Sequence, residues 1–315
     1  SQIEYYKFAK FSKQDNYQYD VNFRNYWSPS RKFTLFVTPN AKLLSEPAQS
    51  ENQKRLQRNY LGVSAGFTYN SEERKQLYFD VDYTREQFNQ EDYKFLQNSK
   101  LQAYLYYKRY FLPETFYYYG LRFGSNTYPQ GLNSPSNVNR PKYGSRRIEP
   151  GFGLEGRLTR YFKIRSYIGY SFLSYKKDVN YKDPVFMVEL EEEVSPNELI
   201  LMGFESTAED SYFTNYVLSE KVYVGYGRFL GDRLLSTTKV EYAYRNYSRP
   251  NRRDDQRVAL MTSLEYSYTQ NLKLLGDFLF DLLSSDAVNP KPSYAVDPSA
   301  GYRNIRLTLS AKYLF

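Results

Sequence analysis

The types of side chain present set the first limits on chemistry. The 315-residue chain contains neither histidine nor cysteine, which excludes Ser-His and Cys-His nucleophilic sites and thiolate metal sites. Asp80 and Asp82 come nearest to a catalytic acid pair, but two carboxylates on a charged wall are far more often structural. The sequence contains no phosphate-binding loop, dinucleotide fingerprint or metal-binding loop. We therefore expect a protein that is not an enzyme and that holds no cofactor and no metal.

Many charged residues fall at every second position of segments whose other positions are apolar. This two-residue period is typical of a strand with one polar and one apolar face. The residues predicted to line a polar interior are Arg24, Lys32, Lys100, Lys108, Arg122, Arg147, Arg157, Arg165, Asp80, Asp82 and Glu155. Two interpretations remain open. The charges pair across neighbouring strands and hold the wall together, or an unpaired basic excess makes the interior favour anions.

Aromatic residues share the same polar positions. Of the 36 Tyr and 22 Phe in the chain, we place Tyr78, Tyr104, Tyr106, Phe116, Tyr118 and Tyr167 on the inward face. Rings that project into an interior would narrow it or block it.

Charge is distributed unevenly along the chain. The net charge is +8 overall, whereas residues 178–213 hold ten acids and one base, a net charge of −9. We predict an acidic extracellular loop insert at about 178–212, and attraction to the basic body suggests that it closes the mouth as a gate. The gate residues would be Glu189, Glu191, Glu192, Glu193 and Glu198. The alternative is an ordinary solvated surface loop.

The alternation recurs along nearly the whole chain and predicts fourteen strands, with twelve or sixteen as alternatives. They cover about 3–12, 17–27, 31–43, 59–70, 75–88, 98–111, 114–126, 146–159, 162–176, 213–229, 233–247, 256–269, 272–286 and 301–315. Short and long connections then alternate, except that the first connection is short out of turn. Short turns at one end and long loops at the other are typical of a transmembrane β-barrel.

A soluble β-sandwich also alternates, so the period alone does not decide the class. Many of the predicted strands exceed ten residues, which matches the roughly 9–11 residues of a tilted membrane strand better than the usual 5–6 of a soluble one. Tyr and Phe gather near strand ends, as they do in an interfacial girdle. We therefore predict an all-β fold, a closed antiparallel transmembrane β-barrel, with residues 1–315 as a single domain. Whether a further domain precedes Ser1 stays open.

The last residues resemble a known signal. Thr308, Ser310, Tyr313 and Phe315 have the spacing of the C-terminal targeting signal of Gram-negative outer-membrane β-barrels, except that Ser310 stands where that signal usually has glycine. The resemblance implies location in the Gram-negative outer membrane, contact with its lipid and lipopolysaccharide, and recognition of the last strand by the barrel-assembly machinery through β-augmentation.

Two functions fit these expectations. The first is a channel or transport barrel that passes or exports an anionic small solute or polymer, gated by the acidic loop. The second is a structural or assembly barrel that anchors a larger cell-envelope or secretion complex through a periplasmic or surface protein partner. The basic residues form no patch or motif for nucleic acid, so we expect no nucleic-acid partner. The oligomeric state is not predicted.

Overall fold

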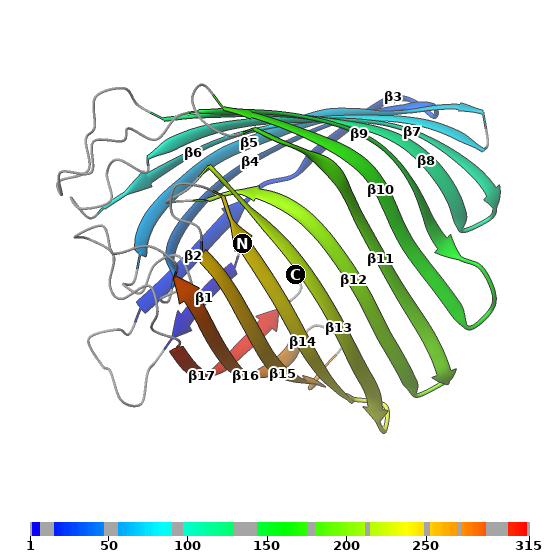
Figure 1. Ribbon diagram of the computed structural model, residues 1–315. Helices are drawn as coiled ribbons and strands as arrows, with labels where there is room; N and C mark the ends of the chain where they lie inside the picture. The colour runs from blue at the N-terminus through cyan, green and yellow to red at the C-terminus, as the bar shows by residue number, and fades with distance from the viewer. Residues whose placement is uncertain are drawn as a thin grey trace.

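The computed structural model consists of β-strands (Figure 1). It describes residues 2–6, 16–46, 56–72, 74–89, 97–128, 144–175, 180–211, 215–248, 253–269, 272–287 and 302–313. Within these ranges no helix is long and apolar enough to cross a membrane. The same ranges hold no group of three or more acidic residues placed to bind a metal ion.

The strands form one antiparallel sheet in which, with one exception, each pairs with the next along the chain. They are β1 (Gln2–Tyr6), β2 (Asn16–Asn22), β3 (Asn25–Ser30), β4 (Phe33–Glu46), β5 (Leu56–Glu72), β6 (Lys75–Phe88), β7 (Asn98–Leu112), β8 (Thr115–Thr127), β9 (Ser145–Arg157), β10 (Phe162–Tyr175), β11 (Tyr181–Ser195), β12 (Glu198–Asp210), β13 (Tyr216–Leu230), β14 (Leu234–Tyr247), β15 (Arg253–Ser267), β16 (Leu272–Ala287) and β17 (Tyr302–Tyr313). Because β2 and β3 pair with successive parts of β4, they form one interrupted row, and the described sheet has sixteen rows.

The connections between these rows alternate strictly. Short turns such as 31–32, 113–114 and 196–197 lie at one end of the sheet, and longer connections such as 47–55 and 128–144 lie at the other. The first connection, 7–15, now falls with the longer ones, which removes the exception found in the sequence. We call these the short-turn end and the long-connection end.

The sheet curls until its first and last strands approach one another (Figure 1). β1 and β17 come within 8 Å between Cα atoms, but no hydrogen-bonded ladder joins them among the residues described. The antiparallel all-β fold is therefore confirmed, while closure of the barrel stays a prediction.

The acidic segment is the main correction to the prediction. It is not a loop, because its residues form the wall strands β11 and β12, joined by a two-residue turn at 196–197. On β11 the carboxylates Glu189, Glu191 and Glu193 lie at one parity, while Val188 and Leu190 lie at the other. The period of a two-faced strand is thus present, and the high local charge concealed it. Among the described residues 180–211, two strands of the sheet therefore stand where the sequence predicted an acidic loop insert at 178–212.

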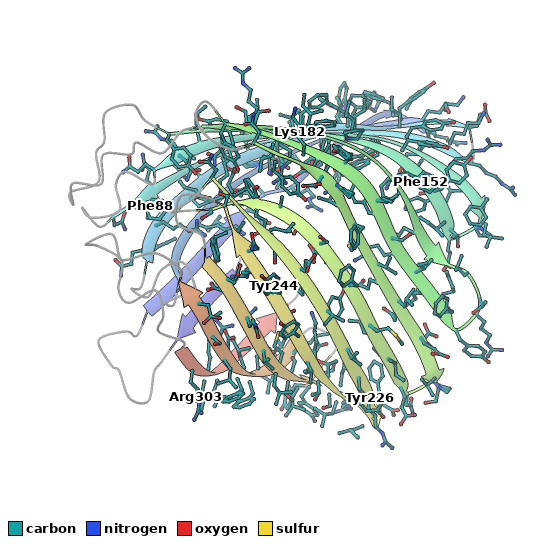
Figure 2. The ribbon with its side chains drawn as sticks, in the orientation of Figure 1. Phe88, Phe152, Lys182, Tyr226, Tyr244 and Arg303 are labelled. Carbon is teal, nitrogen blue, oxygen red and sulfur yellow. The ribbon has the colours of Figure 1, made fainter. Side chains whose placement is uncertain are left out.

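The two faces of the sheet differ sharply. Apolar side chains on the outer face stay exposed, with Ile168 at 60%, Val224 at 56% and Val240 at 51%. Phe152 and Tyr226 belong to the same outer set (Figure 2). Charged and tyrosine side chains occupy the concave face instead. In water such a large exposed apolar surface would be a liability, whereas against lipid it is the expected exterior of a membrane barrel.

The outer face provides a direct test with neighbouring positions on β13. An arginine at Val224 would place charge on the apolar face, which in a bilayer costs about 2–4 kcal/mol at the midplane. An arginine at Gly225 would enter the concave face, where a new Cβ meets its nearest neighbour at an ordinary 3.5 Å. We expect Val224→Arg to make folding into lipid vesicles less favourable by this amount and Gly225→Arg to change the free energy of folding little. Equal losses would contradict the assignment of faces.

Candidate functional site: the concave wall

A line of aromatic rings crosses the concave wall from β4 to β10. Phe36 stacks on Tyr78 with 6.0 Å between ring centroids, and Tyr78 lies 6.1 Å from Tyr106. Tyr106 meets the edge of Tyr118 at 5.5 Å, and Tyr118 stacks on Tyr167 at 6.4 Å. Each such pair contributes about 0.5–1.5 kcal/mol beyond the apolar area that it buries. The rings therefore hold one another in place across several strands.

Glycines on adjacent strands let these rings lie flat on the wall. A Cβ at Gly153 would lie 2.2 Å from the Tyr118 ring, and one at Gly151 would lie 2.3 Å from the Tyr167 hydroxyl oxygen. The Tyr106 ring occupies the corresponding space over Gly120, at 2.7 Å from a Cβ built there. Aromatic rings that cover strand glycines are a known way to stabilise curved sheets. The inward rings are thus packed along the wall and do not project across the interior.

Cations lie over the rings. The Arg122 guanidinium sits 4.5 Å from the Tyr167 ring centroid, donates to the Tyr106 hydroxyl at 3.1 Å, and pairs with Glu149 at 3.2 Å. The Glu149 carboxylate also accepts from the Tyr167 hydroxyl at 3.0 Å. Arg122 and Glu149 therefore find their partners within the protein, which favours a structural role for this cluster.

Lys108 lies over rings instead of carboxylates. Its ammonium is 4.7 Å from the Phe116 ring centroid and 5.8 Å from that of Tyr78. A cation–π contact of this kind contributes about 0.5–2 kcal/mol, depending on solvation. Because neither ring carries a formal charge, these two contacts do not neutralise the positive charge of the Lys108 ammonium.

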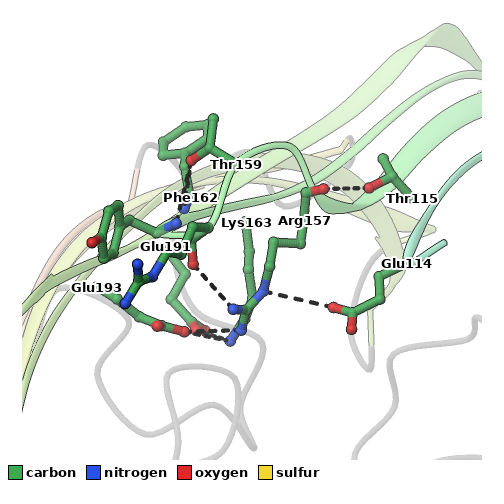
Figure 3. A network of polar contacts seen from close by, with 10 residues as sticks. Glu114, Thr115, Arg157, Thr159, Phe162, Lys163, Glu191 and Glu193 are labelled. Carbon is green, nitrogen blue, oxygen red and sulfur yellow. Dashed lines mark hydrogen bonds and ion pairs between the residues drawn. The ribbon is translucent and has the colours of Figure 1, made fainter. Parts of the chain in front are cut away.

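Near the short-turn end, charges from β9, β10 and β11 form a ladder (Figure 3). Arg157 pairs with Glu193 at 3.0 Å, and Lys163 pairs with Glu191. Arg165 pairs with Glu189 at 3.2 Å. Two of the predicted interior bases therefore pair with carboxylates that had been assigned to a loop.

Further contacts complete this ladder. Arg157 also reaches Glu114 at 3.6 Å, as Figure 3 shows. Arg165 reaches Glu155 at 3.8 Å, and the Tyr223 hydroxyl donates to Glu189 at 2.5 Å. Because Arg165 is half exposed, its ion pairs contribute only about 0–1 kcal/mol each and weaken with salt. The ladder fixes the position of charges more than it stabilises the fold.

A buried carboxylate lies closer to the long-connection end. Glu86 is 4% exposed and pairs with Lys100 at 3.0 Å and Arg58 at 3.0 Å. Asn98 donates a further hydrogen bond to it at 3.1 Å. A buried charge of this kind is tolerated only with such partners. Pairing across neighbouring strands, the first of the two interpretations drawn from the sequence, therefore describes five of the eleven predicted residues: Lys100, Arg122, Arg157, Arg165 and Glu155.

The remaining predicted interior residues are more dispersed. Asp80 and Asp82 lie on the concave face of β6, and Asp82 accepts a hydrogen bond from Ser64. Arg24 lies between β2 and β3 and donates to the Tyr26 hydroxyl at 3.2 Å. Lys32 lies in the turn before β4 and not along a strand.

Two of the predicted gate residues lie outside the concave face. Glu192 is exposed, at the same parity on β11 as the exposed Val188. Glu198 pairs with Arg228 at 3.6 Å and accepts from the Tyr226 hydroxyl at 2.8 Å, at the short-turn end of the outer face. None of the five predicted gate residues therefore forms a mouth.

The sheet splits between β11 and β12 at the long-connection end. The β11–β12 ladder stops at Phe186 and Ser206, two residues before Pro184 on β11, which has no amide N–H to donate. Beyond this point residues 207–210, here called the β12 end, leave β11, and Figure 1 shows the two strands separated. The Ala208 carbonyl oxygen then accepts from Arg147, an inner residue of β9.

Asp210 anchors the β12 end onto the concave wall. Its carboxylate accepts from Asn126 of β8 at 3.2 Å, from Ser145 of β9 at 3.0 Å and from Tyr175 of β10 at 2.9 Å. Tyr216, which follows on β13, stacks on Tyr175 with 6.5 Å between centroids. Hydrogen bonds to a charged group contribute about 1.5–3 kcal/mol each, so this contact is the strongest candidate for a constriction inside the curved sheet.

Sequence reasoning missed the Asp210 cluster. Its donors come from positions 65 and 84 residues earlier in the chain as well as from the nearer Tyr175. A two-residue period also puts Asp210 on the outer parity of β12, so only the departure of that strand brings it inside. The proline on β11 was the one available signal, because proline is confined to sheet edges and irregularities.

The predicted assembly signal is described only in part. Ser310 and Tyr313 lie on β17, which pairs with β16, and Phe315 lies outside the described residues. Recognition of this strand by assembly machinery stays a prediction.

Comparison with known proteins identifies the fold. No protein-family model and no curated protein matches the sequence. The structure is similar to the FrpB iron transporter from Neisseria meningitidis (TM-score 0.65, 9% identity, covering 96% of this chain and 56% of that one). It is also similar to the copper transporter OprC (0.57, 8%, 95% and 56%) and to the ferric citrate transporter FecA (0.54, 11%, 95% and 55%).

The chain spans a little over half the length of each of these structures. At such low identity the likeness establishes the fold alone. The structural neighbours are Gram-negative outer-membrane β-barrel proteins, so the likeness shows that this chain has the fold of such barrels. They also agree with the predicted location in the Gram-negative outer membrane.

The ring-on-glycine packing yields a measurable prediction. Gly153→Ala places a methyl group 2.2 Å from the Tyr118 ring, and overpacking of this kind typically costs about 1–3 kcal/mol. We expect that loss in urea unfolding of the refolded protein, and a much smaller loss in a Tyr118→Leu background. Gly225→Ala is the control, because its Cβ meets only ordinary contacts from 3.5 Å. Equal losses for Gly153→Ala in the two backgrounds would contradict the packing described.

Proposed function

We propose that the chain is an outer-membrane transport barrel with a polar interior. The sheet closes by pairing of β1 with β17, since lipid leaves no partner for an open strand edge. The exposed apolar face meets lipid and lipopolysaccharide, the short turns face the periplasm, and the longer connections face outward. The close approach of β1 to β17 supports this closure.

The flat seating of the inward rings is the observation on which the proposal rests. Eight-stranded barrels fill their interior with side chains, whereas barrels of 16–18 strands leave an aqueous channel. Rings that project across the interior would fill this channel. Tyr118 and Tyr167 instead lie against glycines of the wall, as their contacts with Gly153 and Gly151 require. A barrel of sixteen rows built in this way retains room for a solute.

The solute is a polar molecule, and an anionic one is favoured. Many inner charges neutralise one another, so the selectivity comes from the few cations with other partners. Lys108 contacts rings, Arg147 contacts a carbonyl oxygen, and Arg24 contacts a tyrosine hydroxyl. The net charge of +8 supports the same preference. The similar structures are transporters, which supports transport over enzyme activity.

The gate is the β12 end and not the carboxylates of β11. We propose two positions for this segment. In one it lies on the concave wall through Asp210, and in the other it would pair with the free edge of β11 beyond Val185. The first position narrows the interior and the second widens it. A two-state element of this kind responds to any ligand that binds the two states unequally.

The alternative is a barrel that anchors a larger envelope assembly. The β12 end inside the curved sheet favours it, because a permanently constricted interior suits an anchor better than a channel. Channel activity separates the two functions.

Single-channel recording in a planar bilayer tests the proposal. Asp210→Ala removes the acceptor of three hydrogen bonds, each worth about 1.5–3 kcal/mol. Because about 1.4 kcal/mol is a tenfold change in an equilibrium, we expect closed states of the variant to be at least roughly tenfold less populated. Glu209→Ala is the matched control, since it removes an adjacent exposed carboxylate.

The reversal potential under a KCl gradient in the same recordings measures the selectivity between potassium and chloride. We expect a modest preference for chloride in both the wild type and Asp210→Ala. Silence from both proteins, each shown to be folded in the bilayer, would overturn the channel and favour the anchor. Equal gating in the two carboxylate variants would remove the β12 end as the gate while leaving the channel in place.

A further inference from the structure

A polar cavity lies between the β12 end and the concave wall. Its volume is about 240 Å³, and its lining includes Lys100 and Gln102 of β7, Asn126 of β8, Ser145 and Arg147 of β9, and Asp210. A single water needs only about 10–15 Å³ of such space, so the cavity can hold a larger molecule. Leu173 is the apolar side chain of this lining.

One buried atom in this lining lacks a partner. Asn126 is 4% exposed, and its amide nitrogen donates to Asp210 and to the Tyr128 hydroxyl. Its carbonyl oxygen Oδ1 is buried with no hydrogen-bond partner in the protein. An unsatisfied buried acceptor costs about 1–3 kcal/mol, and a rotation of the Asn126 side chain toward the cavity would let an O–H or N–H donor of a bound molecule recover this energy.

Three of the four charged residues of the lining, Lys100, Arg147 and Asp210, are already engaged. Lys100 pairs with Glu86 at 3.0 Å, and Arg147 donates to the Ala208 carbonyl oxygen. The Asp210 carboxylate accepts from three donors. A simple anion would have to compete with Glu86 for its cation, and a simple cation would have to displace the donors of Asp210. Neither type of ion matches this cavity.

A hydroxyl-rich neutral molecule does match it. Hydroxyl groups both donate and accept, so one molecule can donate to Asn126 Oδ1 and accept from the amide of Gln102. The lining presents polar and apolar surface in similar amounts, which suits the hydroxyl groups and the C–H faces of such a molecule. We propose that this cavity is a binding site for a saccharide or polyol. The proposal rests on the transport function above and goes beyond it, because this one site takes a neutral ligand while the unpaired cations of the inner wall favour anions.

The site would also be coupled to the proposed gate. Glu209 and Asp210 belong to the β12 end, while the other lining residues belong to the wall. The cavity therefore exists only while the β12 end lies on the wall. A ligand bound there would favour that position, because it has no equivalent site in the other.

Sucrose is a suitable probe, with succinate as the anionic comparison. Binding is measured by saturation-transfer NMR on the full chain in lipid nanodiscs. Gly124→Val fills the floor of the cavity, where a Cβ already lies 3.3 Å from Arg147 Cβ. Gly225→Val makes the same change on the concave face of β13 with ordinary contacts from 3.5 Å. We expect at least a tenfold loss of sucrose affinity in the first variant and none in the second.

A second variant protects the test against misfolding of the first. Gln102→Leu removes an amide from the lining while leaving the contacts of Asp210 intact, and it should weaken sucrose binding as well. No sucrose binding by the wild type, wild-type affinity in both cavity variants, or displacement of sucrose by succinate would each overturn the proposal. Conducting protein without sucrose binding would refute the site alone, whereas sucrose binding by a silent barrel would refute the channel alone.

Discussion

The register of the antiparallel ladder is the constraint on which the other features depend. Because side chains alternate between faces with a period of two residues, a shift of one residue would exchange the whole apolar and polar sets. The ladder places Glu189 opposite Arg165 and Gly153 opposite Tyr118. The first pairing allows an ion pair, and the second allows a ring to lie over a glycine. Both the charge pairing and the space inside the curved sheet follow from this register.

The most informative part of the molecule is where the ladder stops. β12 leaves β11 beyond Ser206, and residues of its outer parity then meet the concave wall. This single departure creates the Asp210 contacts, covers Leu173 to 1% exposure and encloses the polar cavity. The proposed gate and the proposed binding site therefore share one structural cause, and the proline at position 184 gives a physical reason for its location.

The period of two residues was sufficient to predict the strands and their faces, because alternation is a local property of the sequence. It failed for residues 178–212, where the net charge of the segment was given more weight than the parity of Glu189, Glu191 and Glu193. The Asp210 cluster could not be predicted, since it joins strands distant in sequence through a break in the sheet. The flat seating of Tyr118 and Tyr167 likewise depends on which glycines the neighbouring strands place opposite them.

The most direct test of the two-faced membrane wall is spin-label accessibility along β13. The chain has no cysteine, so single cysteines at positions 221 to 226 can each be labelled without background in a lipid bilayer. The account predicts that labels at 222, 224 and 226 are accessible to lipid-soluble oxygen and that labels at 221, 223 and 225 are accessible to a water-soluble nickel reagent. Accessibility without this alternation, or with the two sets exchanged, would contradict it.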